Sequence, residues 1–390
     1  MESSTIPELR FPEFEGEWVK KKLSDLFIFK NGVNASKEDY GKGYKFINVL
    51  DIIQNDYITH DRIIGSVNIS ESEFNKNIVE YGDVLFQRSS ETRKEVGQAN
   101  VYLDKELPAT FGGFVIRGTK KIEYDPSFMN ALLKTSRSRK EITSKSGGST
   151  RYNVGQDTLS KVVIFTTKPK EQTKIAAFLI AIDKRIKILQ NKKSELVQYK
   201  KEIMQQLFSR TIRFKNEDDS NFPDWEEKRL GDICEKKSSN ISANTLSKNT
   251  GEFKIHGATG FLQYVDFYRE ENHYISIVKD GAGVGRILLC EAKSSVLGTL
   301  DILKPKGDND IHFLYSLLSN IRFNKYITGS TIPHIYFKDY SKEKMLVPTL
   351  PEQQKIAYFL SSVDKSIEKI TAQIEDSIVF KKGLLQKMFV

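Results

Sequence analysis

Residues 171–186 read EQTKIAAFLIAIDKRI, and residues 352–367 read EQQKIAYFLSSVDKSI. Ten of the sixteen positions are identical, at a constant offset of 181 residues. The offset continues without a gap to KKEIMQQLF (200–208) and KKGLLQKMF (381–389). A period of this size is far longer than that of a solenoid repeat, so the pattern indicates a duplicated domain.

The beginnings of the two halves also match. FPEFEGEWVKKKLSDL (11–26) resembles FPDWEEKRLGDI (222–233), and the only two tryptophans, Trp18 and Trp225, fall at the same place in this alignment. The interiors between the matched segments show no alignment. Each half therefore combines a repeated beginning and a repeated end with a divergent middle.

The repeated stretches carry apolar residues at alternating spacings of three and four, which is typical of a coiled-coil seam. We expect one helix from about Pro169 to Phe208 and a second over 350–390. The simplest partner for each apolar stripe is the other copy, which predicts an antiparallel intramolecular coiled coil; a core helix inside each domain is the alternative. The predicted seam and docking residues are Ile175, Ile182, Ile186, Leu189, Leu196, Ile203, Ile356, Val363, Ile367, Ile370 and Ile374, with Ile378 continuing the second stripe.

The remainder of each half is rich in short apolar runs punctuated by glycine, such as GDVLFQRSS (82–90) and HYISIVKDGAGVGRILLC (273–290). These runs predict an α+β fold with two globular domains, each built on a twisted, mainly antiparallel sheet, and joined by the two long helices. We expect the first domain at 1–168, the first helix at 169–210, the second domain at 211–349 and the second helix at 350–390.

Polar and basic loops follow several of the predicted strands. The net charge of +9 favours an anionic partner, most simply nucleic acid, although a lysine-rich chain can be basic without binding DNA. The Gly-Ser-Thr loop at 148–150 recurs at 329–331 with different residues after it. Arg, Asn, Ser and Thr can contact base edges and phosphates; the alternative is ordinary solvated turns. The candidate DNA-binding residues are Arg88, Ser89, Ser149, Thr150, Arg151, Tyr152, Asn153, Lys279, Ser330, Thr331 and His334.

Motifs for catalysis and metal binding are missing from the sequence. GAGVGR (281–286) has no Walker lysine and no GxGxxG spacing, so we interpret it as a turn at the edge of a strand. No two prolines are adjacent, which excludes the Asn-Pro-Pro-Tyr motif of an amino-methyltransferase. Two cysteines and five histidines without ligand spacing predict no metal site. No apolar run reaches 18 residues and MESSTIPELR lacks a signal region, so we expect a cytoplasmic location.

Over essentially its whole length, the chain resembles the DNA specificity subunits of type I restriction–modification systems. The most specific part is the duplicated helix start, LPEQQKIAYFLSSVD (350–364) and KPKEQTKIAAFLIAID (168–183). The W-x-x-x-x-L-x-D pattern that opens each half agrees, as do GDVLFQR and HGATGFLQY. The first copy departs from the family pattern at Lys170, where a proline is usual, but Pro169 lies one position earlier.

The resemblance implies that each domain is a target-recognition domain for one half of a split DNA sequence, and that the paired helices dock two methyltransferase subunits. It implies no catalytic residue and no bound cofactor in this chain. S-adenosylmethionine, ATP and Mg²⁺ would belong to the methyltransferase subunits and to the motor–nuclease subunits. Two alternatives stay open: a coiled-coil adaptor without sequence-specific DNA readout, and a self-contained nuclease.

Overall fold

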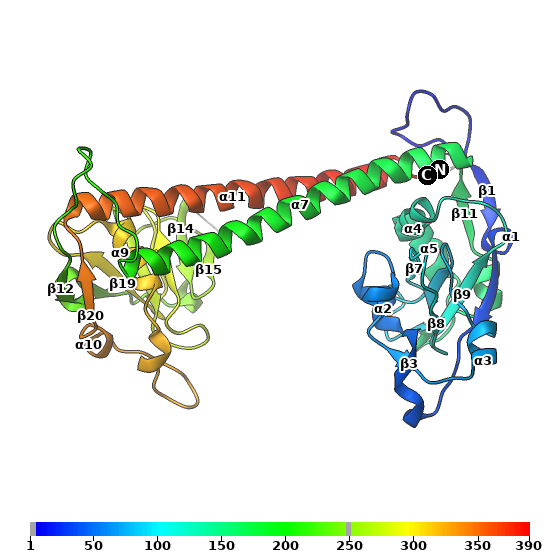
Figure 1. Ribbon diagram of the computed structural model, residues 1–390, viewed down its shortest axis with the longest axis horizontal. Coiled ribbons are helices and arrows are strands. Elements are labelled where there is room, and N and C mark those ends of the chain that lie inside the picture. Colours follow the sequence, from blue (N-terminus) through cyan, green and yellow to red (C-terminus); the bar gives the residue numbers. More distant parts are fainter. Residues whose placement is uncertain (1–4, 247–250) are drawn as a thin grey trace. The chain divides into compact units, whose positions relative to one another are not determined.

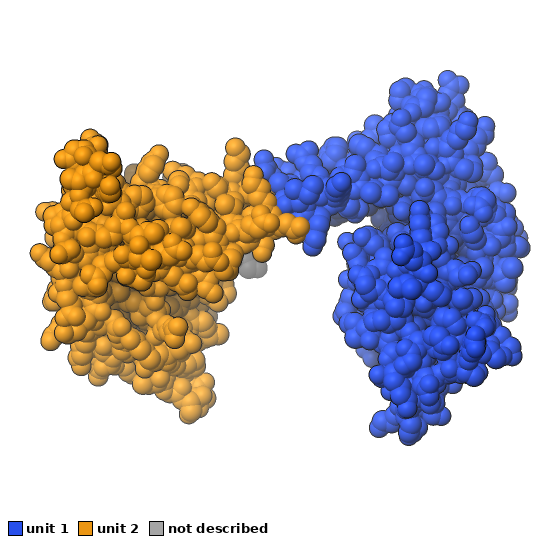
Figure 2. Space-filling view, in the orientation of Figure 1, with its two compact units in different colours: residues 1–189, 373–390 blue, residues 190–372 orange. Residues whose placement is uncertain are grey.

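The computed structural model describes residues 5–246 and 251–390 (Figure 1). The chain divides into two compact units, which we call unit 1 (residues 1–189 and 373–390) and unit 2 (residues 190–372) (Figure 2). The long helices α7 (Pro169–Phe208) and α11 (Leu350–Lys387) each contribute to both units. Unit 1 holds the beginning of α7 and the end of α11, and unit 2 holds the rest of both helices.

The other elements of unit 1 are short strands and helices. Its strands are β1 (Val19–Lys22), β2 (Phe27–Asn31), β3 (Tyr40–Ile47), β4 (Ser66–Val67), β5 (Val84–Gln87), β6 (Ser89–Ser90), β7 (Ala99–Val101), β8 (Thr110–Phe111), β9 (Val115–Lys120), β10 (Tyr152–Asn153) and β11 (Val163–Thr166). Its α-helices are α1 (Leu23–Leu26), α2 (Val49–Gln54), α3 (Glu71–Lys76), α4 (Pro126–Lys134), α5 (Ser136–Ser144) and α6 (Gln156–Ser160).

Unit 2 is built from a similar set of elements. Its strands are β12 (Glu226–Arg229), β13 (Cys234–Ser238), β14 (Phe253–Gly257), β15 (Gly260–Val265), β16 (Tyr274–Val278), β17 (Ile287–Cys290), β18 (Ser295–Val296), β19 (Leu300–Pro305) and β20 (Lys344–Val347). Its short α-helices are α8 (Leu230–Ile233), α9 (Ile311–Ser319) and α10 (Phe337–Tyr340).

The two units share one strand topology. A four-stranded antiparallel sheet has the order β2-β9-β5-β7 in unit 1 and β13-β19-β16-β17 in unit 2. A three-stranded sheet, β4-β3-β8 or β15-β14-β18, has one antiparallel and one parallel pair. The interiors that show no sequence alignment therefore fold in the same way. The predicted α+β fold with mainly antiparallel sheets is confirmed.

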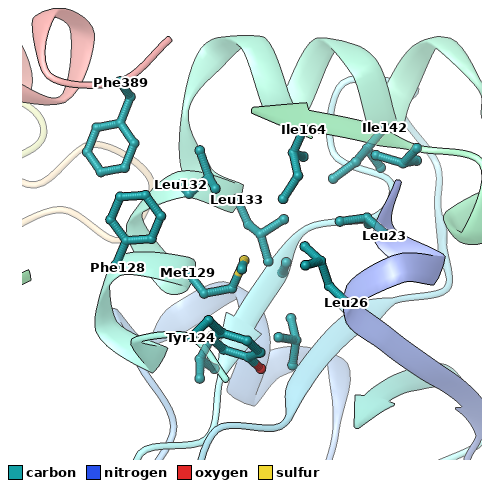
Figure 3. Packing of buried hydrophobic residues seen from close by; sticks show 14 of the residues in the cluster. Leu23, Leu26, Tyr124, Phe128, Met129, Leu132, Leu133, Ile142, Ile164 and Phe389 are labelled. Carbon is teal, nitrogen blue, oxygen red and sulfur yellow. The ribbon is translucent and has the colours of Figure 1, made fainter. Parts of the chain in front are cut away.

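In each unit the largest buried cluster includes the four-stranded sheet, the helix that follows the sheet and parts of the long helices. In unit 1, Asp125 caps α4 by accepting from the backbone N–H of Phe128 at 2.9 Å, and the apolar face of α4 is buried. Phe389, just beyond the end of α11, lies over Phe128 with ring centroids 5.3 Å apart (Figure 3). In unit 2 the repeat mate of Phe389, Phe208, packs on Phe313 of α9 with centroids 6.0 Å apart.

The repeated Glu-Gln pair attaches α7 to the globular part of unit 1. Glu171 accepts hydrogen bonds from Arg10 Nε at 2.7 Å and Nη2 at 2.8 Å. Gln172 Oε1 accepts from the backbone N–H of Asp125, the N-cap of α4, at 2.9 Å. Burial acts to raise the pKa of the Glu171 carboxyl, but hydrogen bonds from Arg10 and Thr167 outweigh it and hold the pKa below its usual value.

Unit 2 repeats this junction at the start of α11. Glu352 accepts from Arg213 Nε at 3.1 Å and Nη2 at 2.8 Å, and Gln353 Oε1 accepts from the backbone N–H of Asp310 at 2.9 Å. Here the indole Nε1 of Trp225 also donates to Glu352, at 2.9 Å. In unit 1 the indole of Trp18 lies near Glu171 without reaching hydrogen-bond geometry.

The predicted antiparallel pairing of the two long helices is confirmed within each unit (Figure 1). In unit 1 the start of α7 and the end of α11 share one buried apolar cluster, and Lys381 pairs with Asp183 at 2.5 Å. In unit 2 Lys200 pairs with Asp364 at 2.6 Å. The two ion pairs are repeat mates, because the lysines and the aspartates both differ by the repeat offset. The same helix-to-helix register therefore occurs in both units.

The seam follows the predicted spacing with one error. In α11 the side chains that face inward continue from Ile374 through Ser377 and Lys381 to Leu384, at spacings of three and four. Ile378 was expected on this stripe, but it is 49% exposed, because it lies one position beyond the seam on a helix that turns about 100° per residue. The mid-helix seam positions Leu189, Leu196, Ile367 and Ile374 are only half-buried.

Candidate nucleic-acid interface

The repeated Gly-Ser-Thr loop is a tight, backbone-paired loop in unit 1. Its base is closed by hydrogen bonds between Gly147 and Asn153, at 3.0 and 2.8 Å. Gly148 has φ +109°, and a Cβ there would lie 2.1 Å from the Arg151 carbonyl oxygen, so this turn requires glycine. The backbone geometry leaves Ser149, Thr150 and Arg151 exposed at the tip.

Two of the segments predicted to bind DNA are brought together in unit 1. Strands β6 and β10 pair, with Ser89 opposite Asn153, and the backbone N–H of Val154 donates to the Arg88 carbonyl at 2.9 Å. The Arg88 side chain is exposed and donates through Nη1 to the Gly113 carbonyl at 3.2 Å. Tyr152, by contrast, packs against the core of unit 1. This edge thus presents a cluster of basic and polar side chains.

Unit 2 builds the same edge from different residues. Thr328 and His334 close the loop with hydrogen bonds of 2.9 and 2.8 Å, and Gly329 has φ +87°. The backbone N–H of Ile335 donates to the Lys279 carbonyl at 3.0 Å. Its repeat mate in unit 1, Val154, makes the equivalent hydrogen bond to the Arg88 carbonyl. Ser330 and Thr331 are exposed at the tip.

The charges at the two edges differ. The Arg151 tip has no basic counterpart in unit 2, where the loop continues Ile332-Pro333. Lys279 donates to the buried carboxylate of Asp301 at 3.2 Å, which holds its ammonium back from solvent. His334 packs edge-on against Tyr336 with ring centroids 4.9 Å apart. Unit 1 therefore presents the more basic of the two loop clusters.

GAGVGR forms the turn between the antiparallel strands β16 and β17, so the interpretation as a strand-edge turn is confirmed. All three of its glycines have positive φ. Arg286 at its end donates to the Ala258 carbonyl at 2.8 Å and ties the turn to the tip of the β14–β15 hairpin. Sequence reasoning missed this contact because the two segments are 28 residues apart and share no pattern.

Within residues 5–246 and 251–390, no three His, Cys, Asp or Glu side chains lie close enough together to hold a metal ion. None of the helices in this described part of the chain has the length and apolar composition needed to span a bilayer.

Two stretches of the chain, residues 15–198 and 223–378, match the family model of the type I restriction modification DNA specificity domain. The chain belongs to this family. The two matched stretches contain most of the two sequence halves, each with its Gly-Ser-Thr loop and the start of its long helix. The resemblance drawn from the sequence motifs is confirmed.

Several members of the specificity family are similar to this chain. The type I restriction enzyme MjaIX specificity subunit of Methanocaldococcus jannaschii is 27% identical over 95% of this chain and 92% of its own length. The putative MjaX specificity subunit of the same organism is 24% identical over 91% of this chain and 89% of its own. The crystal structure of the type I S subunit from M. genitalium has a TM-score of 0.60 and 18% identity, over 99% of both chains.

Proposed function

We propose that unit 1 and unit 2 each read one half of a split DNA sequence, so that the chain is the DNA-specificity subunit of a type I restriction–modification complex. One observation carries the proposal: both units hold the same pair of loops at the same sheet edge, by equivalent backbone hydrogen bonds, but present different side chains there. Membership of the specificity family supports it. An adaptor without DNA readout has no need for two differently equipped edges on one scaffold.

We further propose that each unit docks one methyltransferase subunit on its helices. Val197 and Tyr199 of α7 are 50% and 44% exposed, and their repeat mates on α11, Ile378 and Phe380, are 49% and 56% exposed. Exposed apolar side chains that recur at equivalent positions favour two copies of the same partner. The predicted role of the helices in docking thus extends to their outward faces.

The chain itself is proposed to be non-catalytic. S-adenosylmethionine would be bound by the methyltransferase subunits, and ATP and Mg²⁺ by the motor–nuclease subunits. The purified chain should then transfer no methyl group and cleave no DNA. Methyl transfer or cleavage by the chain alone would contradict this proposal, and cleavage would support the alternative of a self-contained nuclease.

The test combines binding with mapping. Single-molecule methylation mapping in the source cell should give a split target, and DNA containing it should bind the chain with its methyltransferase subunits more tightly than scrambled DNA. The affinity should fall steeply as salt rises, because contacts to phosphates release counterions. Equal affinity for scrambled DNA, or no dependence on salt, would favour the adaptor.

A further inference from the structure

One exposed aromatic side chain stands beside the candidate reading residues of unit 1. Phe114 is 63% exposed and lies in the turn between β8 and β9. Its carbonyl accepts from the backbone N–H of Arg88 at 2.9 Å, and the preceding carbonyl, of Gly113, accepts from the Arg88 guanidinium at 3.2 Å. The turn and the arginine are thus held together by two hydrogen bonds.

The turn is fixed from its other side as well. The N–H of Gly113 donates to the Val33 carbonyl at 2.9 Å, and a Cβ on Gly113 would lie 1.9 Å from Asn34 Oδ1. The backbone position of Phe114 therefore follows from the fold. A pocket of about 340 Å³ opens beside it, with Tyr40 and Leu50, 44% and 56% exposed, on its other walls. Three exposed apolar side chains around one hollow mark an interaction site.

Unit 2 has the same arrangement with other side chains. Its equivalent of Phe114 is Thr299, whose carbonyl accepts from the backbone N–H of Lys279 at 3.0 Å. Each unit therefore pairs a basic residue with a neighbour that carries an apolar group. In the major groove, Arg and Lys contact guanine O6 and N7, and Phe and the Thr methyl contact the 5-methyl of thymine.

We infer that Phe114 is a specificity-determining residue of unit 1 that packs on the 5-methyl group of a thymine in the major groove, at a base pair adjoining the one that Arg88 contacts. Neighbouring base pairs are about 3.4 Å apart, within reach of the side chains of two residues whose backbones are hydrogen-bonded to each other. The inference rests on the proposed function. It concerns unit 1, because Asp301 restrains the Lys279 ammonium in unit 2.

The experiment replaces thymines by uracil, one at a time, in the half-site read by unit 1, and measures binding by the full chain with its methyltransferase subunits. One replacement should weaken binding about fourfold, which corresponds to about 0.8 kcal/mol, the value of one buried methyl-sized group. Phe114→Ala should weaken binding to thymine DNA by a similar factor and abolish the difference between thymine and uracil. Phe114→Leu should restore part of that difference.

Thr299→Ala is the matched control, since it alters the same position of unit 2 and should leave the thymine–uracil difference in the first half-site unchanged. Thermal stability should hardly respond to Phe114→Ala, because the ring is exposed. The inference is overturned if no uracil in this half-site weakens binding, or if the difference survives in Phe114→Ala. It is also overturned if Phe114→Ala impairs only assembly with the methyltransferase subunits. Failure of the unaltered complex to prefer its mapped site would instead contradict the proposed function.

Discussion

At the helix junctions, unit 1 and unit 2 use the same chemistry: a buried glutamate bound to an arginine, and a buried glutamine bound to the N-cap of a core helix. At the loop edges they share the backbone and differ in the side chains, with Arg151 in one and Ile332 in the other. The backbone of each loop is fixed by one glycine, Gly148 or Gly329, and by a pair of backbone hydrogen bonds at the base of the loop. Its tip residues can therefore change without disturbing the fold, which is what a pair of domains for two different DNA sequences requires.

The largest effect is expected at the junctions. Glu352→Gln removes a buried carboxylate that accepts from both Arg213 and Trp225, so we expect unit 2 to lose about 3 kcal/mol of unfolding free energy. Glu171→Gln should cost unit 1 a similar amount, since the Thr167 hydroxyl donates to Glu171 in place of the indole. Denaturation followed by tryptophan fluorescence measures the two units separately in single-tryptophan variants: Trp225→Phe leaves Trp18 to report unit 1, and Trp18→Phe leaves Trp225 to report unit 2. A large loss in one unit only would show that the two junctions are not energetically equivalent.

The loop edges should respond in binding and not in stability. Arg151→Ala is expected to weaken binding to the mapped site by about 1–3 kcal/mol, the size of one good base contact. Ile332→Ala, at the repeat-mate position in unit 2, removes an uncharged side chain and should therefore have the smaller effect on binding. Both side chains are exposed, so the melting temperature should hardly change. If Arg151→Ala leaves the affinity for the mapped site unchanged, Arg151 is an ordinary turn residue that does not contact the DNA.

Acid should weaken unit 1 through Glu171. Its pKa is lower in the folded chain than the usual 4.5, so its stabilising contribution is present above that value and is lost as pH falls through the folded pKa. We expect the transition reported by Trp18 to shift to lower denaturant concentration below about pH 4.5. In Glu171→Gln this part of the pH dependence should disappear. A pH profile that is the same in both proteins would show that other groups control it.

The smallest effects are expected at the ion pairs between the helices. Lys200→Ala and Lys381→Ala should each cost about 0.5 kcal/mol, because both pairs are partly exposed. Exchanging the charges, with Lys200→Asp and Asp364→Lys together, should recover most of the loss. If the double variant is no more stable than Lys200→Asp or Asp364→Lys alone, this ion pair does not stabilise the antiparallel register.

The long helices could be predicted from the sequence because their signal is local. The three-four spacing from Ile175 onwards and the constant repeat offset are enough to give the seam and its partner. The Gly-Ser-Thr loops could be found because they share that offset. Ile378 was wrongly placed on the seam because it is the apolar residue of the two, whereas the position that faces inward is occupied by the polar Ser377.

Other features required the fold. The arginine that binds each junction glutamate lies 161 residues away in unit 1 and 139 in unit 2, so no fixed spacing marks it. The common topology of the interiors depends on strand pairing between distant segments, which different side chains can satisfy equally well. Phe114 has no sequence repeat mate, and the hydrogen bonds that join its turn to Arg88 and Val33 place it at the reading edge.

The central claim is that the two units are equivalent readers on one duplicated scaffold. Fragment 1–216 contains one globular domain and one complete helix, and it lacks the end of α11 that belongs to unit 1. In a dimer, Ile203, Leu207 and Phe208 of the second copy can replace their repeat mates Leu384, Met388 and Phe389. The replacement buries the apolar stripe by the same antiparallel register.

The most direct measurement is therefore methylation mapping with fragment 1–216 and the methyltransferase subunits, preceded by light scattering. The fragment should dimerise at micromolar concentration, and its methylated sites should be inverted repeats of one half of the target of the intact chain. A strictly monomeric fragment, or a dimer whose methylated sites are not palindromic, would contradict the account.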